Sequence, residues 1–506
     1  MTQMTASPVE AQYQAQSVLK SQPHARGPFR PQELVSLRAR QARANFSITM
    51  RVLDACLLGV IAIWGLLKIH HGPLSGLKVF DLLPFLALSC VCFFTLKSLG
   101  LYNFSKSESW AQHGLRLILA LSLGLMTALL LSLLTANPLN LISILLTMGL
   151  WGAGLFINLH LIYSQIIWNW RSRGLLTPNI VLVGASESAR TLIAKALITK
   201  ECHILGIFDD RMGRVPENLY GVPVLGTTKD MMDHKILPYV DQVIIAIDGA
   251  AKSRLKALIA KISTLPNWVS LLVGADDIGL DSTLNRISKM PLRQVSGQAK
   301  LSTSDYRSFF KRLQDIAIGT TALIIFAPIM LLVAVLIKLD SKGPVFFRQK
   351  RHGFNNEAIW VWKFRSMRTE CADATASRQV RQNDERITRI GRFIRKTSLD
   401  ELPQLFNVLK GEMSLVGPRP HAIGMKTGEQ ASAQMVSEYA WRHRLKPGMT
   451  GLAAIKGSRG ALNSVDDVQK RVTWDVEYIE RQSFWFDLYI MAMTIPCLLG
   501  DSETIR

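Results

Sequence analysis

The chain has 506 residues, of which 48% are hydrophobic, and it carries a formal net charge of +21. This length allows two or three domains, each able to bury its own core. The hydrophobic residues are gathered in long runs, which indicates membrane helices joined to soluble parts. In such a chain the positive charge favours anionic lipid headgroups and phosphorylated substrates as partners, and it argues against nucleic acid.

Cysteine usage and the N-terminal composition bear on the compartment. The six cysteines show neither a CxxC pair nor the spacing of a metal site. Three of them, Cys56, Cys90 and Cys92, lie in apolar runs, where cysteine behaves as a small hydrophobic residue. The first 45 residues are polar, so we expect no cleavable signal peptide. A reduced protein that faces the cytoplasm fits this usage best.

The N-terminal part of the sequence predicts a disordered arm followed by membrane helices. Residues 1–47 form a polar, basic arm, which we expect to stay in the cytoplasm. Four apolar segments follow, each long enough to cross a hydrocarbon core of about 30 Å as a helix. We therefore predict a four-helix transmembrane region over residues 48–170. Its segments span 52–69, 79–99, 114–135 and 140–168.

From residue 178 the pattern changes to alternating strands and helices. Residues 179–184 read Asn-Ile-Val-Leu-Val-Gly, which is typical of a buried parallel strand. Further strands are predicted at 204–208, 242–247 and 269–274. This alternation predicts a Rossmann-like α/β domain over residues 178–300.

The turn after the first of these strands departs from a dinucleotide-binding turn. It reads Gly184-Ala-Ser-Glu-Ser-Ala189, so only the first glycine and the closing small residue match the G-x-G-x-x-G/A pattern. Glu187 would also repel a pyrophosphate. The sequence leaves two alternatives open: a domain that binds a nucleotide or another ligand, and a folded regulatory or dimerisation module.

A fifth apolar segment, residues 313–337, has basic residues on both flanks and Pro328 near its middle. A spanning helix would leave one basic flank outside, against the positive-inside rule. Proline removes one backbone hydrogen bond and kinks a helix. We therefore predict a re-entrant helix that returns to the cytoplasm, with a plain fifth span as the alternative.

The stretch from 363 to 420 places one adjacent acid pair, Asp400 and Glu401, among many cations. Pro403 fits only in the first turn of a helix, so we predict that the pair opens an amphipathic helix. Acids there stabilise a helix by about 0.3–1 kcal/mol without any other role. Alternatively, one carboxylate attacks phosphorus and the other binds Mg²⁺. The predicted apolar stripe of this helix is Leu402, Leu405, Phe406 and Leu409.

Lys363 and Arg365 follow a strand-like segment at residues 358–362. Side chains alternate along a strand, so these two cations are expected on one face as a two-pronged site. Arg395 lies shortly before the acid pair, and Arg419 stands between two prolines. Such cations can fork around the oxygens of a diphosphate.

Three motifs in this region resemble the bacterial sugar transferase family. They are Lys363-Phe-Arg-Ser-Met367, the run from Ser398-Leu-Asp-Glu-Leu-Pro-Gln404 to Gly417-Pro-Arg-Pro420, and Lys446-Pro-Gly-Met-Thr-Gly451. The resemblance covers about 305–500. The four-span and α/β parts look like those of the family's large members, which start exopolysaccharide, capsule or O-antigen repeat units.

The resemblance implies a fold, a location and a reaction. It implies a monotopic, mixed α/β catalytic domain over residues 305–506 on the cytoplasmic side of a bacterial inner membrane. The implied enzyme moves hexose-1-phosphate from a UDP-sugar, expected to be UDP-glucose, to undecaprenyl phosphate. Asp400 is the implied nucleophile, Glu401 the implied Mg²⁺ ligand, and Pro328 the break in the re-entrant helix. The implied phosphate contacts are Lys363, Arg365, Arg395 and Arg419.

Other readings of the sequence remain beside this one. Residues 452–457 read Leu-Ala-Ala-Ile-Lys-Gly where many members have Trp-Ala-Gln-Val-Asn-Gly, which leaves UDP-galactose and N-acetylhexosamine donors open. A sugar-nucleotide dehydratase or epimerase would need Tyr-x-x-x-Lys within 178–300, and none occurs there. A non-enzymatic scaffold that senses a nucleotide would leave the acid pair unexplained. The oligomeric state, including a homo-oligomer, is also open.

Overall fold

A computed structural model describes residues 46–69, 79–102, 110–272, 285–294, 305–369 and 384–500, with short gaps inside these ranges. The predicted disordered arm over 1–47 lies almost entirely outside the described residues. The chain forms two compact units, one made of residues 41–176 and one that contains residues 177–506. We describe each unit by itself.

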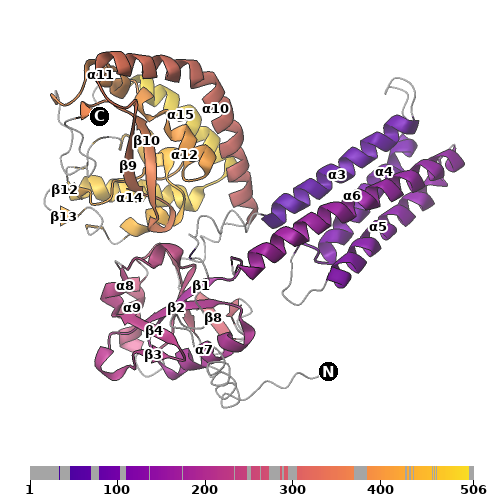
Figure 1. Cartoon of the computed structure of the whole chain (residues 1–506), viewed down its shortest axis with the longest axis horizontal. Coiled ribbons are helices and arrows are strands. Elements are labelled where there is room, and N and C mark those ends of the chain that lie inside the picture. The colour runs from indigo at the N-terminus through magenta and orange to yellow at the C-terminus, as the bar shows by residue number, and fades with distance from the viewer. Residues whose placement is uncertain are drawn as a thin grey trace. The chain divides into compact units, whose positions relative to one another are not determined.

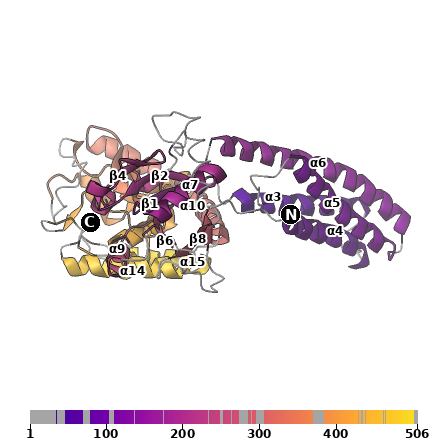
Figure 2. The ribbon, with the colours of Figure 1, turned by 90° about the horizontal axis from the view of Figure 1, so that it is seen from below.

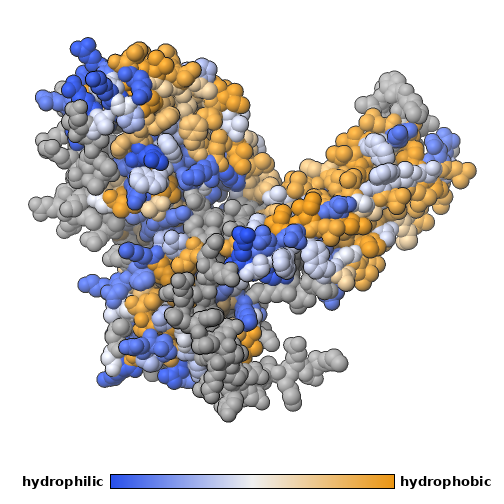
Figure 3. Space-filling model, in the orientation of Figure 1, coloured by the Kyte–Doolittle hydropathy of each residue, from blue (hydrophilic) through white to orange (hydrophobic). Residues whose placement is uncertain are grey.

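The N-terminal unit is a bundle of four helices that run side by side (Figures 1 and 2). They are α3 (Phe46–Ile69), α4 (Val79–Ser98), α5 (Trp110–Ser132) and α6 (Pro138–Ser172). Each contains most of one predicted apolar segment. By length and composition, α3, α5 and α6 can cross a membrane, whereas the apolar part of α4, Leu82–Ser98, is shorter. Hydrophobic side chains cover much of the visible surface of this bundle (Figure 3).

A polar network lies in the core of the bundle, and the sequence analysis did not predict it. Asp54 is fully buried and accepts hydrogen bonds from the hydroxyl groups of Tyr102 at 2.8 Å and Tyr163 at 3.2 Å. His160 Nε2 lies 3.2 Å from the same carboxylate, and His113 Nε2 lies 3.1 Å from His160 Nδ1. These partners satisfy polar groups that would be costly to bury alone. The network therefore ties α3, α5, α6 and the end of α4 together.

The second unit begins with an eight-stranded sheet of order β3-β4-β2-β1-β5-β6-β8-β7. The predicted strands correspond to β1, β2, β5 and β6, and β1 pairs in parallel with β2 and β5. Ile180 and Leu182 of β1 pack with α7, whereas Val181 and Val183 face the cluster that contains Ile262 of α9. Helices therefore cover both faces of the sheet, as in a doubly wound fold.

The elements of this α/β domain have the following bounds. The strands are β1 (Asn179–Val183), β2 (His203–Phe208), β3 (Asn218–Leu219), β4 (Val222–Gly226), β5 (Gln242–Ile245), β6 (Trp268–Leu272), β7 (Asn285–Ile287) and β8 (Met290–Gln294). The helices are α7 (Glu187–Thr199), α8 (Thr228–Met232) and α9 (Lys252–Ile262).

The chain's own residues occupy part of the turn after β1. Gly184 has φ +99°, and a Cβ there would collide with the carbonyl oxygen of Ala246. The N–H of Ala185 donates to the Asp209 carboxylate at 2.8 Å. In a dinucleotide-binding domain the N–H groups of this turn face phosphate. The bond to Asp209 occupies one of these N–H groups, that of Ala185. Both alternatives for the domain, ligand binding and a regulatory or dimerisation role, stay open.

The C-terminal part begins with α10 (Asp305–Asp340), one continuous helix that includes Pro328. Figure 1 shows that α10 is bent, as a proline inside a helix predicts. Side chains on both sides of the proline pack into the same domain. They are Ile318, Ala322 and Leu323 before it and Met330, Val333 and Ile337 after it.

The remaining elements surround a small mixed core. An antiparallel hairpin of β9 (Phe346–His352) and β10 (Ala358–Phe364) lies next to α12 (Gln404–Lys410). The parallel pair β11 (Ser414–Val416) and β14 (Gly448–Thr450) lies beside α15 (Phe484–Gly500). The other elements are α11 (Arg389–Lys396), β12 (Lys426–Thr427), β13 (Gln430–Ala431), α13 (Leu452–Ile455) and α14 (Val465–Arg481).

Candidate active site

The acid pair lies in a short 3₁₀ turn, η8 (Leu399–Glu401), and not at the start of an α-helix as predicted. The N–H of Glu401 bonds to the carbonyl of Ser398, and Ser398 itself has a left-handed conformation with φ 59°. Pro403 has no N–H, so it cannot make the bond that would continue an α-helix through the acid pair. The helix α12 therefore begins only at Gln404.

Because α12 begins at Gln404, a different side of the helix is buried from the one predicted. Leu405 is buried as predicted, but Phe406 is 41% exposed, so the predicted stripe is wrong at this position. The buried side consists of Gln404, Leu405, Asn407 and Val408.

Glu401 is held by two cations. The two terminal nitrogens of Arg419 face the Glu401 carboxylate, with Nη2 2.6 Å from Oε1 and Nη1 3.5 Å from Oε2. Lys363 Nζ donates to Oε1 at 2.8 Å. Burial alone would raise the pKa of Glu401, but the charges of Arg419 and Lys363 outweigh it and hold the pKa well below its usual range. Glu401 is therefore ionised at neutral pH.

Asp400 lies in a different environment from its neighbour. Its residue is 8% exposed, and its Oδ2 is 3.9 Å from Lys363 Nζ, which is beyond hydrogen-bonding distance. Burial raises the pKa of Asp400, the charge of Lys363 opposes this rise, and the charge of Glu401 adds to it. Asp400 is thus the more basic carboxylate and the one less engaged with Lys363.

Three of the four predicted phosphate-binding cations gather around the acid pair. Lys363 is on β10, Arg395 is in the last turn of α11, and Arg419 follows β11. Arg395 lies close enough for its charge to act on Asp400, although burial is the main influence on its own pKa, which is lowered. Elements far apart in the sequence thus bring these cations to one place.

The fourth predicted cation, Arg365, lies elsewhere, and the structure corrects this expectation. β10 ends at Phe364, so the alternation that paired Arg365 with Lys363 stops before it. The Arg365 side chain is buried and donates to the carbonyl oxygens of Lys342 at 2.6 Å and Ser341 at 2.7 Å. These carbonyl groups lie at and just beyond the C-terminal end of α10, where they lack helical partners. Arg365 therefore caps α10.

The sequence analysis missed one cation near the acid pair. Arg351 on β9 pairs across the hairpin with Ile359, so it lies on the same face as Lys363. Burial and the charge of Arg419 lower the pKa of Arg351 to about 10, while Glu401 and Asp400 oppose this shift. Alternation of side chains along β9 would have placed Arg351 on this face if the register of the hairpin had been known.

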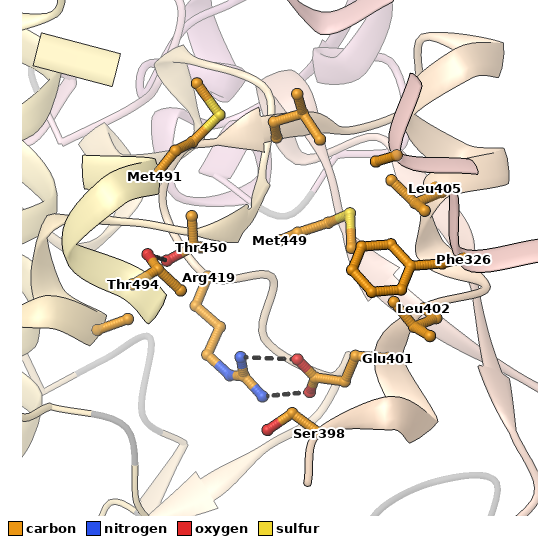
Figure 4. A pocket seen from close by; sticks show the side chains of 13 residues that line it. Phe326, Ser398, Glu401, Leu402, Leu405, Arg419, Met449, Thr450, Met491 and Thr494 are labelled. Atoms are coloured by element: carbon orange, nitrogen blue, oxygen red, sulfur yellow. Dashed lines mark hydrogen bonds and ion pairs between the residues drawn. The ribbon is translucent and has the colours of Figure 1, made fainter. Parts of the chain in front are cut away.

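A cavity of about 250 Å³ opens beside Glu401 and Arg419 (Figure 4). The acid and its cation lie at one end, and apolar side chains line most of the remainder. Its walls come from α10, η8, α12, β11, β14, α13 and α15 and from residues next to these elements. The lining residues are Ala322, Phe326, Ser398, Glu401, Leu402, Leu405, Leu415, Arg419, Met449, Thr450, Ala454, Met491 and Thr494. The cavity therefore joins a charged end to an apolar body.

Comparison with protein families finds two families that match different parts of the chain. The family described as bacterial sugar transferase matches residues 306–501, which contain the acid pair and all four cations around it. The family described as CoA-binding domain matches residues 97–271, which include most of the α/β domain.

Similar proteins share parts of the chain. An undecaprenyl-phosphate glucose phosphotransferase of Komagataeibacter xylinus is 38% identical over 63% of this chain and 59% of its own length. A UDP-glucose:undecaprenyl-phosphate glucose-1-phosphate transferase of Xanthomonas campestris pv. campestris is 38% identical over 57% of this chain and 59% of its own length. The chain thus spans less than two thirds of both proteins.

A shorter relative is matched over most of its length. The exopolysaccharide production protein PSS of Rhizobium leguminosarum bv. phaseoli is 49% identical over 37% of this chain and 92% of its own length. The fold and the site define a protein with membrane helices and a buried acid pair among cations. This protein belongs to the bacterial sugar transferase family.

Proposed function

We propose that this protein is a phosphoglycosyl transferase that moves hexose-1-phosphate from a UDP-sugar to undecaprenyl phosphate. The reaction would be the first membrane step of exopolysaccharide or capsule synthesis. The observation that carries the proposal is the different environment of the two carboxylates. Glu401 is ionised and fixed between two cations, whereas Asp400 is buried, more basic and beyond hydrogen-bonding distance of Lys363.

In the first step, an Asp400 oxygen attacks the β-phosphorus of the donor. A P–O bond forms to Asp400, and the bond from this phosphorus to the bridging oxygen breaks. The bridging oxygen keeps the electron pair and leaves as part of UMP. Lys363, Arg395 and Arg419 lie around the acid pair, where they would stabilise the charge that develops on the oxygens of the diphosphate. Arg351 adds a fourth positive charge nearby.

In the second step, a phosphate oxygen of undecaprenyl phosphate attacks the same phosphorus and releases the Asp400 carboxylate. The two substrates can thus use one site in turn. The cavity beside Glu401 is mostly apolar and is lined by Phe326 of α10 and Met491 of α15. Such a lining suits the hydrocarbon part of the acceptor next to its phosphate.

We also propose that α10 is re-entrant, so that the catalytic domain lies on the cytoplasmic side of the inner membrane. Arg312, near the start of α10, donates to the carbonyl oxygens of Val408 and Leu409. Arg365 binds the carbonyl groups at the other end of the same helix. A straight helix of 36 residues would be about 54 Å long, and a spanning one would place its two ends on opposite sides of the membrane. Contacts of both ends with one domain therefore favour a bent helix that returns.

The acid pair also fits a magnesium ion. Mg²⁺ in phosphoryl-transfer sites is held by one or two carboxylates together with substrate phosphates. Glu401 is ionised, and its Oε2 has only the 3.5 Å contact with Arg419 among the described residues, so the carboxylate can accept a further ligand. We propose Glu401 as the protein ligand. When bound, the ion would neutralise charge on the diphosphate.

The direct test is release of UMP from candidate UDP-sugars, with and without undecaprenyl phosphate. UDP-glucose is the first donor to test, because the two longer relatives carry glucose in their names. UDP-galactose and the UDP-N-acetylhexosamines are the alternatives. One equivalent of UMP released without acceptor, with the sugar phosphate retained on the protein, is the expected result. Absence of UMP release from all of these donors would contradict the proposal.

A further inference from the structure

Arg419 lies in a backbone segment that is poor in N–H donors. Its neighbours Pro418 and Pro420 have no N–H to donate. The carbonyl oxygen of Arg419 accepts a hydrogen bond from Arg442 Nη2 at 2.7 Å. The carbonyl oxygen of Pro420 accepts one from Arg351 Nη1 at 2.6 Å. Two guanidinium groups thus hold consecutive carbonyl groups of the segment.

Arg442 is itself fixed from behind. It lies on η10 (Tyr439–Arg444), is 1% exposed, and forms an ion pair with Asp475 of α14 at 2.7 Å. Its Nη1 also lies 2.8 Å from His421 Nε2. Burial and the charge of Arg442 hold the pKa of His421 well below its usual range, so the imidazole is neutral and can accept this bond. A buried ion pair costs desolvation, and removal of one partner leaves an uncompensated buried charge.

We propose that Arg442, held in place by Asp475, is a positioning residue for Arg419. Arg442 does not contact the carboxylates of the acid pair in this structure. It fixes the backbone from which the Arg419 side chain reaches Glu401, 2.6 Å from its Oε1. A test by turnover rests on the proposed function. The binding of a diphosphate near Arg419 can be measured without turnover.

The proposal has a physical consequence for the rate. A bidentate cation stabilises a diphosphate only when its fork faces the oxygens. Displacement of such a group by about 1 Å can cost about 10²-fold in rate. Loss of the ion pair between Arg442 and Asp475 should therefore lower kcat/KM without any change in the residues that contact the donor.

The test replaces both members of the pair, as Arg442→Gln/Asp475→Asn in the full chain. This choice removes both charges of the pair, because a buried charge that has lost its ion-pair partner is strongly destabilising. The control is Glu477→Gln/Arg481→Gln, which removes an exposed ion pair from the same helix. Should the double variant fail to fold, Arg442→Lys keeps a positive charge beside Asp475 but loses the planar guanidinium group, and it is expected to give a smaller loss in the same direction.

Two measurements separate positioning from a general structural effect. The first is kcat/KM for UMP release, which we expect to fall about 10- to 100-fold in the double variant and to stay unchanged in the control. The triple variant that also carries Arg419→Gln should have nearly the same kcat/KM as Arg419→Gln alone. The effects of coupled residues are not additive. Fully additive losses would overturn the proposal.

The second measurement is the dissociation constant of inorganic pyrophosphate by calorimetry, which needs no turnover. It should rise about tenfold in the double variant and stay constant in the control. If the wild type releases no UMP but pyrophosphate binding weakens as expected, the proposed function fails and the positioning role stands. Equal pyrophosphate binding by wild type and double variant, including equal absence of binding, would overturn the positioning role.

Discussion

At Asp400 and Glu401, two adjacent carboxylates have different surroundings and therefore different acidities. Glu401 contacts Arg419 and Lys363 within 2.8 Å, and its pKa lies well below the usual range. Asp400 is buried at 3.9 Å from Lys363, and its pKa is raised. A pair of carboxylates with separated pKa values can divide two roles between them.

Replacement of each carboxylate should affect the reaction in a different way. Asp400→Asn cannot form an aspartyl-phosphate, so UMP release should fall by about 10³-fold or more. Glu401→Gln keeps the nucleophile, so a small residual activity that responds to Mg²⁺ concentration is expected. The control is Asp466→Asn, at an exposed position of α14. More than a few per cent of activity in Asp400→Asn would argue against the covalent step.

The pH dependence should report the environment of Asp400. The carboxylate attacks only when ionised, so kcat/KM should fall as the pH falls through its raised pKa. The charge of Lys363 lowers this pKa, and Lys363→Met should therefore move the acid limb of the profile to higher pH. Lys410→Met, at an exposed position, should leave the limb in place. An acid limb at the same pH in Lys363→Met would contradict the assignment.

At the scale of secondary structure, α10 depends on contacts at both of its ends. Arg312 holds the start of the helix to α12, and Arg365 binds the free carbonyl groups at its end. Neither contact was predicted, because each joins residues far apart in the sequence. Pro328 allows α10 to bend, and side chains on both sides of it pack into the same domain.

Arg365 should matter for stability more than for substrate binding. Arg365→Met removes a donor from the partly buried carbonyl groups of Ser341 and Lys342, so the free energy of unfolding should fall by about 1–3 kcal/mol. Thermal unfolding of the variant and of Arg368→Met, whose residue is exposed, provides the comparison. The KM for the UDP-sugar should change little in the folded protein. A raised KM with unchanged stability would instead restore Arg365 as a phosphate contact.

The sidedness of α10 can be measured with cysteines. In a cysteine-depleted protein, Arg307→Cys and Lys342→Cys lie at exposed positions on either side of the apolar segment. A membrane-impermeant thiol reagent should label both from the cytoplasmic side. Asn137→Cys, in the uncharged connection between α5 and α6, should react from the opposite side.

The same labelling of positions 307 and 342 should be repeated in a protein that carries Pro328→Ala. Proline costs about 3 kcal/mol in a straight helix, so its removal should favour a spanning helix. We expect mixed labelling of the two cysteines and reduced activity. Labelling of 307 and 342 from opposite sides in the protein that retains Pro328 would contradict the re-entrant helix.

At the scale of the whole molecule, the chain builds separate hydrophobic cores. One cluster lies within the four-helix bundle, two cover the faces of the α/β sheet, and the others lie within residues 318–491. A relative is matched over 92% of its length by only 37% of this chain. Both observations indicate that the C-terminal domain does not need the rest of the chain for its core.

A protein that begins near residue 300 should therefore keep UMP release in detergent or nanodiscs, within about threefold of the full chain. It would lose the hydrogen bond of 3.1 Å from Asn355 to the carbonyl of Leu237 in the α/β domain. Asn355→Gly in the full chain removes the same bond, tolerates the left-handed backbone at φ 52°, and is the control. A folded but inactive truncated protein would show that the α/β domain contributes to the site.

The sequence by itself determined the apolar helices, four parallel strands, the family and the acid pair, because these depend on local composition, periodicity and contiguous motifs. Tertiary structure decided which cations reach the acids. Arg351, Arg419 and Lys363 meet only because a hairpin and a proline-flanked segment pack together, while Arg365 turns to a helix end. It also decided the network at Asp54, whose partners come from separate helices. Distances across a fold depend on how distant segments pack together. The periodicity of a sequence does not give these distances.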